Sequence, residues 1–117
     1  MKYGVFWKNR GYNPREQLKK DINCNYLIVG GGITGVSLAY FLVKYGAKNI
    51  ILIERNTIAS GATGKAAGTL VIKGELDLKD IIKIYGKKKG LIYWRNNHQG
   101  LKKIKEIIKK ERINCDY

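Results

Sequence analysis

The stretch from residue 25 to residue 54 constrains the fold more than any other part of the chain. Residues 26–29 form a short apolar run rich in strand-forming side chains, and three glycines follow it directly. Apolar residues between 36 and 43 then recur at the i, i+3, i+4 and i+7 spacing of a helix, and residues 50–53 form a second apolar run. The sequence therefore predicts a strand, a helix and a second strand within 30 residues, which indicates an α/β fold.

The pattern G-x-G-x-x-G lies on the first turn of this unit, with its glycines at Gly30, Gly32 and Gly35. In dinucleotide-binding folds the first glycine permits the tight turn and the second lets the backbone approach a pyrophosphate. The third lets the helix pack closely on the strands. The first amides of a helix lack intrahelical partners and lie at the positive end of its dipole, so they attract phosphate. The pattern predicts a dinucleotide site, and a glycine turn in an ordinary α/β unit is the alternative.

Glu54 follows the second predicted strand, 19 residues after Gly35. A carboxylate at this position can accept hydrogen bonds from the ribose of an adenosine. Its charge would also repel a 2′-phosphate, which argues against NADP. We therefore expect a dinucleotide without that phosphate.

A second glycine-rich run, RNTIASGATGKAAG, covers residues 55–68. Gly64-Lys65 invites comparison with a nucleoside-triphosphate loop, but Ala59 and Ala66 stand where that motif needs glycine and a hydroxyl residue. Small side chains and free amides suit a backbone that approaches a ligand closely, and a plain surface loop is the alternative.

Length and composition limit what else the chain can be. A chain of 117 residues can form one small domain, which is short for an enzyme that must also hold a substrate. The N-terminus does not resemble a signal peptide, and no apolar run approaches a membrane span, so we expect a cytoplasmic protein. Cys24 and Cys115 stand alone without metal-ligand spacing, so we expect reduced thiols and no metal site.

The net charge of +14 is concentrated in residues 79–112, which hold 12 of the 23 basic side chains and three acids. Such a concentration can mark a nucleic-acid or membrane surface, or simply a solvated lysine-rich face. Lysine outnumbers arginine 18 to 5, although arginine is the better bidentate ligand for phosphates and base edges. We therefore expect neither a nucleic acid nor a membrane as partner.

The flanking segments give weaker patterns. Residues 1–24 read as an irregular lead-in whose aromatic side chains, at Tyr3, Phe6, Trp7 and Tyr12, are expected to cover apolar surface. Residues 69–72 are predicted to form a short strand.

Two helices are predicted after that strand. Asp77 is expected to cap the first, with Leu76 and Ile81 as a hydrophobic staple. The expected inward-facing residues of the two helices are Ile81, Ile84, Tyr85 and Ile92 in the first, and Leu101, Ile104, Ile107 and Ile108 in the second. Lys102, Glu106 and Lys110 should form a charged ladder outside the second helix, and His98, between the helices, is expected to be structural or solvated.

The stretches YLIVGGGITGVSLAYFL and ILIERNTIASGATGKAAGTLV resemble the FAD-dependent oxidoreductases of the D-amino-acid oxidase type. That family includes glycine and sarcosine oxidases, dimethylglycine dehydrogenase and γ-glutamylputrescine oxidase. The features that favour FAD over NAD are the acid–base pair Glu54-Arg55 and the run from Ser60 to Gly68, which in the family wraps the flavin side of the cofactor. The resemblance covers nearly the whole chain and implies a Rossmann-like FAD-binding domain over residues 25–117.

The resemblance, together with the glycine motif, nominates one set of cofactor-binding residues: Gly30, Gly31, Gly32, Ile33, Thr34, Gly35, Glu54, Arg55, Ser60, Gly61, Ala62, Thr63, Gly64, Ala67 and Gly68. Some relatives carry, at the position of Lys65, a histidine that bonds covalently to the flavin. Lysine cannot form that linkage, so the resemblance implies non-covalent FAD.

The resemblance also implies an incomplete enzyme. Family members continue into a substrate domain that carries most substrate-binding and catalytic side chains, so no catalytic residue is assigned here. The expected function is the FAD-binding portion of an oxidoreductase that oxidises the C–N bond of an amine or amino acid. We expect this chain to be inactive alone, with a second chain as one source of the missing domain. An NAD-binding Rossmann domain and a basic nucleic-acid-binding module are the alternatives.

Overall fold

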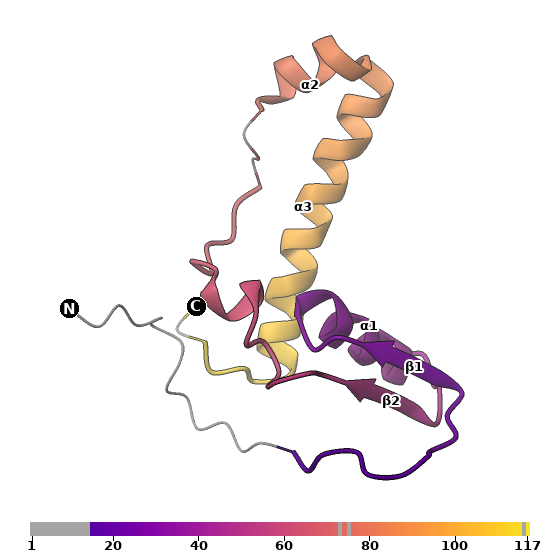
Figure 1. Cartoon of the computed structure of the whole chain (residues 1–117). Helices are drawn as coiled ribbons and strands as arrows, with labels where there is room; N and C mark the ends of the chain where they lie inside the picture. The colour runs from indigo at the N-terminus through magenta and orange to yellow at the C-terminus, as the bar shows by residue number, and fades with distance from the viewer. Residues whose placement is uncertain (1–14, 73, 75, 116) are drawn as a thin grey trace, which may run out of the picture. The chain divides into compact units, whose positions relative to one another are not determined.

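The computed structural model describes residues 15–72, 74, 76–115 and 117 (Figure 1). The chain divides into two compact units, residues 1–67 and residues 68–117, and each is described by itself. The aromatic lead-in residues predicted to cover apolar surface lie among residues 1–14, outside the described residues.

The first unit contains the predicted strand, helix and strand. Strand β1 spans Tyr26–Val29, helix α1 spans Ile33–Lys44 and strand β2 spans Ile50–Ile53. A short 3₁₀ helix, η2, follows at Ala62–Lys65. After α1 the chain reverses at Gly46, whose φ of +85° is a conformation that glycine adopts without strain.

The strands β1 and β2 are parallel and form a two-stranded sheet in which Tyr26 pairs with Ile50 and Val29 with Ile53. Parallel strands need a crossover connection, and α1 provides it. The prediction of an α/β unit at residues 25–54 is therefore confirmed.

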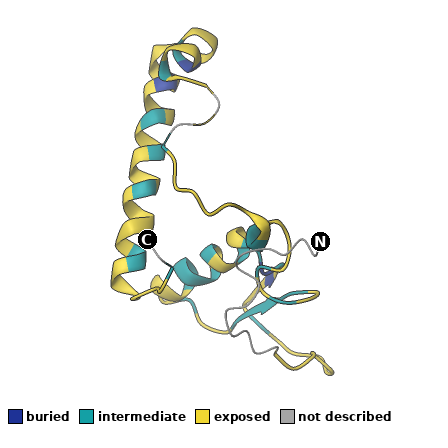
Figure 2. Cartoon of the chain, turned by 90° about the vertical axis from the view of Figure 1, so that its left-hand side faces the viewer, coloured by how far each residue is buried: buried dark blue, intermediate teal, exposed yellow. Residues whose placement is uncertain are grey.

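The core of the first unit is small. Ile28, in the middle of β1, is 6% exposed and packs beneath α1 next to Gly35. Side chains alternate between the faces of a strand, so Leu27 and Val29 point to the other face, where they are 57% and 76% exposed. Figure 2 shows that exposed and half-buried residues predominate throughout the described chain.

The second unit is a pair of helices. Helix α2 spans Leu78–Tyr85 and helix α3 spans Lys87–Lys110, with Gly86 at a φ of +82° between them. The two helices pack against each other, and Ile81 is buried at 5% exposure. Asp77 occupies the predicted N-cap position, where its carbonyl oxygen accepts a hydrogen bond from the amide of Ile81 at 3.0 Å.

The predicted strand at residues 69–72 is wrong, because these residues form no ladder. No other strand is present among the described residues of this unit, and a strand needs a partner for its backbone groups. The carbonyl of Ile72 instead accepts a hydrogen bond from Asn97 Nδ2 on α3 at 3.3 Å.

The boundary between the two helices lies earlier in the sequence than predicted. Helix α3 is continuous over 24 residues and carries both Trp94 and His98 in its interior, because the helix break falls at Gly86 rather than near His98. The predicted inward face of the first helix is wrong at three positions, since only Ile81 is buried there. Exposure is 58% at Ile84, 59% at Tyr85 and 48% at Ile92.

The outer face of α3 carries a different ion pair from the predicted ladder. Glu106 Oε2 accepts a hydrogen bond from Lys103 Nζ at 2.7 Å, three residues earlier rather than four. On the predicted inner face, Leu101, Ile107 and Ile108 are half-buried, whereas Ile104 is 41% exposed. No helix in the described part of the chain is long and apolar enough to span a membrane.

Two glycines of α3 give a matched test of how the helices pack. A Cβ atom at Gly90 would lie 2.7 Å from Ile82 Cγ1 and 3.2 Å from Ile82 Cα, whereas a Cβ at Gly100 would meet no atom within 4 Å. We expect Gly90→Ala to lower the free energy of unfolding by about 1–3 kcal/mol through overpacking. Gly100→Ala should raise it by about 0.5–1 kcal/mol because alanine favours the helix. Urea unfolding of both variants measures the two free energies, and equal changes would contradict the close contact of Gly90 with Ile82.

Candidate functional site

The turn after β1 depends on two glycines. Gly30 has a φ of +104°, and its amide donates a hydrogen bond to the carbonyl oxygen of Ile53 at 2.8 Å. A Cβ atom at Gly35 would overlap the carbonyl oxygen of Gly30. The missing side chain at Gly35 therefore lets the first turn of α1 lie directly against the turn that ends β1.

Glu54 is bonded to this turn. Its Oε2 accepts a hydrogen bond from the amide of Gly31 at 2.7 Å, and its Oε1 accepts one from the amide of Asn56 at 2.9 Å. The hydrogen bond from the Asn56 amide contributes most to stabilising the ionised carboxylate, and the bond from the Gly31 amide contributes next. Together they hold the pKa of Glu54 below its ordinary value. The side chain predicted from spacing alone is thus an ionised carboxylate fixed beside the glycine motif.

The second glycine-rich run is bonded to the first. The amide of Ile33, at the start of α1, donates a hydrogen bond to Thr63 Oγ1 at 2.9 Å. The amide of Ala59 donates one to the carbonyl oxygen of Gly31 at 2.9 Å. The two runs, which the sequence separates by about one strand and one helix, therefore meet at the N-terminus of α1.

Close approach explains three of the small residues at this meeting point. A Cβ atom at Gly31 would lie against Ile58 and the side chain of Glu54, and one at Gly32 would lie 3.3 Å from Thr63 Oγ1. At Gly64 a Cβ would overlap the carbonyl oxygen of Ala59. The first run is consequently bare of side chains where Ile58 and Thr63 approach it, and Gly64 lets the second run fold closely on itself.

The structure brings together about half of the nominated residues, namely Gly30, Gly31, Gly32, Ile33, Gly35, Glu54, Thr63 and Gly64. Within the described residues, no hydrogen bond between the two runs involves the others, so their role stays a prediction: Thr34, Arg55, Ser60, Gly61, Ala62, Ala67 and Gly68. Gly68, at a φ of +76°, opens the second unit.

Sequence reasoning missed Asn56, Ile58 and Ala59 as parts of this arrangement. Asn56 contributes an amide to Glu54, and Ala59 contributes both its amide and its carbonyl. Ala59 has a φ of +62°, which an alanine rarely adopts, so no residue preference could have indicated it. The Asn56 contact had no sequence signal either, because the turn in which a side chain accepts the amide two residues on is typical of Asp, Asn, Ser and Thr and not of glutamate.

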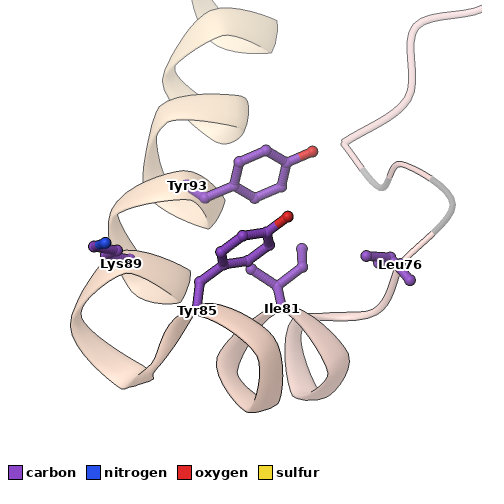
Figure 3. Close-up of a pocket in the computed structure, with 5 residues that line it drawn as sticks. All are labelled: Leu76, Ile81, Tyr85, Lys89 and Tyr93. Carbon is purple, nitrogen blue, oxygen red and sulfur yellow. The ribbon is translucent and has the colours of Figure 1, made fainter.

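Among the hollows in the described parts of the chain, two matter for the site: one beside Glu54 and one in the helical unit. One, of about 950 Å³, adjoins Glu54 and is lined by residues 15–20, 51–56 and 58. The other, of about 530 Å³, belongs to the helical unit; Figure 3 shows the hydroxyls of its two tyrosines pointing in a similar direction, and its lining residues are Leu76, Ile81, Tyr85, Lys89 and Tyr93.

The described residues contain few groups suited to proton transfer or metal binding. No three His, Cys, Asp or Glu side chains gather among them. His98 is exposed on α3, with Nδ1 3.0 Å from the carbonyl oxygen of Trp94 one turn earlier. What the site provides is backbone amides and one carboxylate, which can bind a phosphate and hydroxyl groups.

Comparison with known proteins decides the family. A family model described as FAD dependent oxidoreductase matches residues 25–117. The chain belongs to this family. The resemblance inferred from the two glycine-rich runs is therefore confirmed.

Three relatives show how the match is distributed. The γ-glutamylputrescine oxidoreductase of Escherichia coli is 35% identical over 106 residues, which are 91% of this chain and 25% of that protein. A Bacillus subtilis protein that carries the name Rieske 2Fe-2S iron-sulfur protein YhfW is 29% identical over 114 residues, 97% of this chain and 22% of that protein. Human mitochondrial dimethylglycine dehydrogenase is 44% identical over 66 residues, 52% of this chain and 8% of that protein.

The chain thus spans a quarter or less of the length of these relatives. The comparison with solved structures found no match.

Two glycines of the site give a matched test of its packing. A Cβ at Gly35 would overlap the Gly30 carbonyl, whereas a Cβ at Gly61 would meet no atom within 4 Å. We expect Gly35→Ala to lower the free energy of unfolding of the first unit by about 1–3 kcal/mol. Gly61→Ala should change it by less than about 0.5 kcal/mol. Denaturant titration measures both, and a tolerated Gly35→Ala would contradict the close approach of α1 to the turn.

Proposed function

We propose that this chain is the FAD-binding portion of an oxidoreductase that oxidises the C–N bond of an amine or amino acid. The observation that carries the proposal is the joining of both glycine-rich runs, with the Glu54 carboxylate, at the N-terminus of α1. Membership of the FAD-dependent family supports FAD as the ligand, and the β1–α1–β2 unit supports a Rossmann-like arrangement.

The first turn of α1 suits the pyrophosphate of FAD. It combines the positive end of a helix dipole with a backbone from which side chains are absent at Gly31 and Gly32. A Cβ at either position would already contact protein atoms, so little room is left for any side chain. These residues fit the group because the cradle is made of backbone.

Glu54 suits the adenosine ribose. A carboxylate offers about four acceptor positions, and the amides of Gly31 and Asn56 take one on each oxygen. Each oxygen therefore keeps an acceptor position for a ribose hydroxyl. The hollow of about 950 Å³ beside Glu54 offers space for the adenosine end.

The second run would then extend from Thr63 towards the flavin. Lys65 is the last residue of η2 and carries a primary amine, where the family resemblance implies a flavin-linked histidine in some members. We propose non-covalent binding, since an amine at this position lacks that chemistry.

When bound, FAD supplies the oxidising chemistry by accepting a hydride from the substrate. The part proposed for this chain is to hold and orient the dinucleotide at the N-terminus of α1 and at Glu54. The charge of that carboxylate would also exclude dinucleotides that carry a 2′-phosphate. The name of the Escherichia coli relative supports an amine as substrate. The chain spans a quarter or less of its relatives, so we propose that polypeptide beyond these residues, in the same chain or a second one, forms the substrate site.

The cofactor assignment predicts an order of affinities. FAD should bind the purified chain more tightly than NADP, because the latter brings its 2′-phosphate to the ionised Glu54. Gly32→Val should weaken FAD at least tenfold, or about 1.4 kcal/mol, by displacing Thr63 and filling the cradle. Calorimetric titration measures both, with Gly100→Ala as a remote control and circular dichroism to show that each variant is folded. Tightest binding of NADP, or unchanged FAD affinity in a folded Gly32→Val protein, would refute the assignment.

The same proposal predicts that residues 1–117 do not turn over substrate. A flavin oxidase must hold the C–H bond against the flavin and exclude water on both sides, and the described site provides one dinucleotide cradle. Amino acids and secondary amines added to the FAD-loaded chain without oxygen should leave the flavin absorbance unchanged. Rapid bleaching by any of them would show that the chain is a complete enzyme.

A further inference from the structure

A row of basic side chains runs along one side of α3. Its members recur every seven residues and are all exposed: Lys88, Arg95, Lys102 and Lys109. Seven residues make nearly two helical turns and rise about 10.5 Å, so the four side chains share one side of the helix over about 32 Å. We name these four residues the basic stripe.

The basic stripe points away from the rest of the helical unit. The residue two positions after each of its first three members lies about 200° around the helix, on the opposite side. These inner residues are Gly90, Asn97 and Ile104. Gly90 is buried against Ile82 of α2, and Asn97 Nδ2 donates a hydrogen bond to the carbonyl oxygen of Ile72 at 3.3 Å. The inner side of α3 therefore packs within the unit, and the basic stripe faces solvent.

Lysines beside the stripe are engaged within the chain. Lys103 Nζ lies 2.7 Å from Glu106 Oε2, and Lys105 Nζ lies 5.6 Å from the ring centroid of Tyr117. Within the described residues, no ion pair involves a member of the basic stripe. Its four charges are therefore not compensated by these neighbours and can pair with an external group.

The side chains around the stripe favour a protein as that external group. Leu91 and Ile92, three and four residues after Lys88, lie on the same side of the helix and are 43% and 48% exposed. Protein interfaces combine apolar contacts with a polar rim, and their charges are complementary. Three of the four cations are lysines, whereas arginine is the better bidentate ligand for nucleic-acid phosphates and bases.

Charge also excludes a second copy of this chain as the partner. Each copy carries a net charge of +14, so two copies repel each other. The partner must instead supply carboxylates. A helix that carries one at every seventh residue repeats at the same distance of about 10.5 Å, so a single register pairs all four cations.

We propose that the basic stripe docks on an acidic helix of a protein partner. The carboxylates of that helix recur every seven residues and pair with the four cations, while its apolar side chains contact Leu91 and Ile92. The surface belongs to the second unit, so this interaction does not depend on a dinucleotide at the turn after β1.

Two synthetic helical peptides of about four heptads test the proposal by fluorescence anisotropy with the full chain. One carries glutamate at every seventh residue with leucine beside it, and the other has the same composition with its glutamates spread around the helix. We expect the heptad peptide to bind at least tenfold more tightly, and its binding to weaken with added salt. Equal affinities, no binding of the heptad peptide, or tighter binding of duplex DNA or of phosphatidylserine vesicles would overturn the proposal.

Two fourfold variants locate the contact. The first combines Lys88→Gln, Arg95→Gln, Lys102→Gln and Lys109→Gln. The control removes the same number of charges at exposed positions outside the stripe and combines Lys20→Gln, Lys48→Gln, Lys79→Gln and Lys83→Gln.

The first variant should weaken binding of the heptad peptide at least tenfold, and the control by less than about threefold, because a screened charge away from the contact contributes little. Equal losses would show that net charge alone attracts the peptide and would refute the proposal. Glutamine is a good helix former, and circular dichroism shows whether each variant is folded. Should the first variant unfold, Arg95→Gln with Lys102→Gln against Lys79→Gln with Lys83→Gln gives the same comparison.

Discussion

The hydrogen bond from the Gly31 amide to Glu54 Oε2, at 2.7 Å, is the contact on which the rest of the first unit depends. It ties the residue that follows β2 to the turn that follows β1. Together with the bond from the Gly30 amide to Ile53, it brings the carboxyl ends of both strands to one point. Helix α1 begins at that point, so the positive end of its dipole lies beside the Glu54 carboxylate.

Glycine makes this arrangement sterically possible. Gly35 allows α1 to touch the Gly30 carbonyl, and Gly64 allows the second run to fold on Ala59. The hydrogen bond between Ile33 and Thr63 then couples the second run to the first turn of the helix. The cradle is accordingly one bonded unit, and substitutions that add a side chain at the motif act on stability and on ligand binding together.

Much of this unit could be predicted from sequence because its signals are local. Continuous apolar runs, a helical spacing and a glycine motif lie within 30 residues, and each element confirms the others. The bond from Ala59 to Gly31 was not predictable, since it rests on a positive φ at an alanine. The roles of Ser60, Gly61 and Arg55 remain predictions, because small or exposed residues leave no contact that distinguishes a ligand from a loop.

In the helical unit, much of what the sequence predicted was wrong. Spacing predicted an inward face at Ile84, Tyr85 and Ile92, but these residues are about half exposed, because burial depends on what packs against a helix and not on its period alone. Residues 69–72 have strand-forming side chains, yet their backbone is bonded by Asn97 and no strand lies beside them in the described part of the unit. Long-range partners decided both outcomes.

We propose that the bare backbone and positive dipole end at the N-terminus of α1, together with Glu54, hold the dinucleotide. Amide NMR spectra of ¹⁵N-labelled chain titrated with ADP, the half of FAD that carries both contacts, measure this most directly. We expect the resonances of Gly31, Gly32 and Ile33 to shift in proportion to the bound fraction, while those of α2 stay unchanged. Shifts confined to the hollow around Tyr85 and Tyr93, with the glycine turn unchanged, would contradict it.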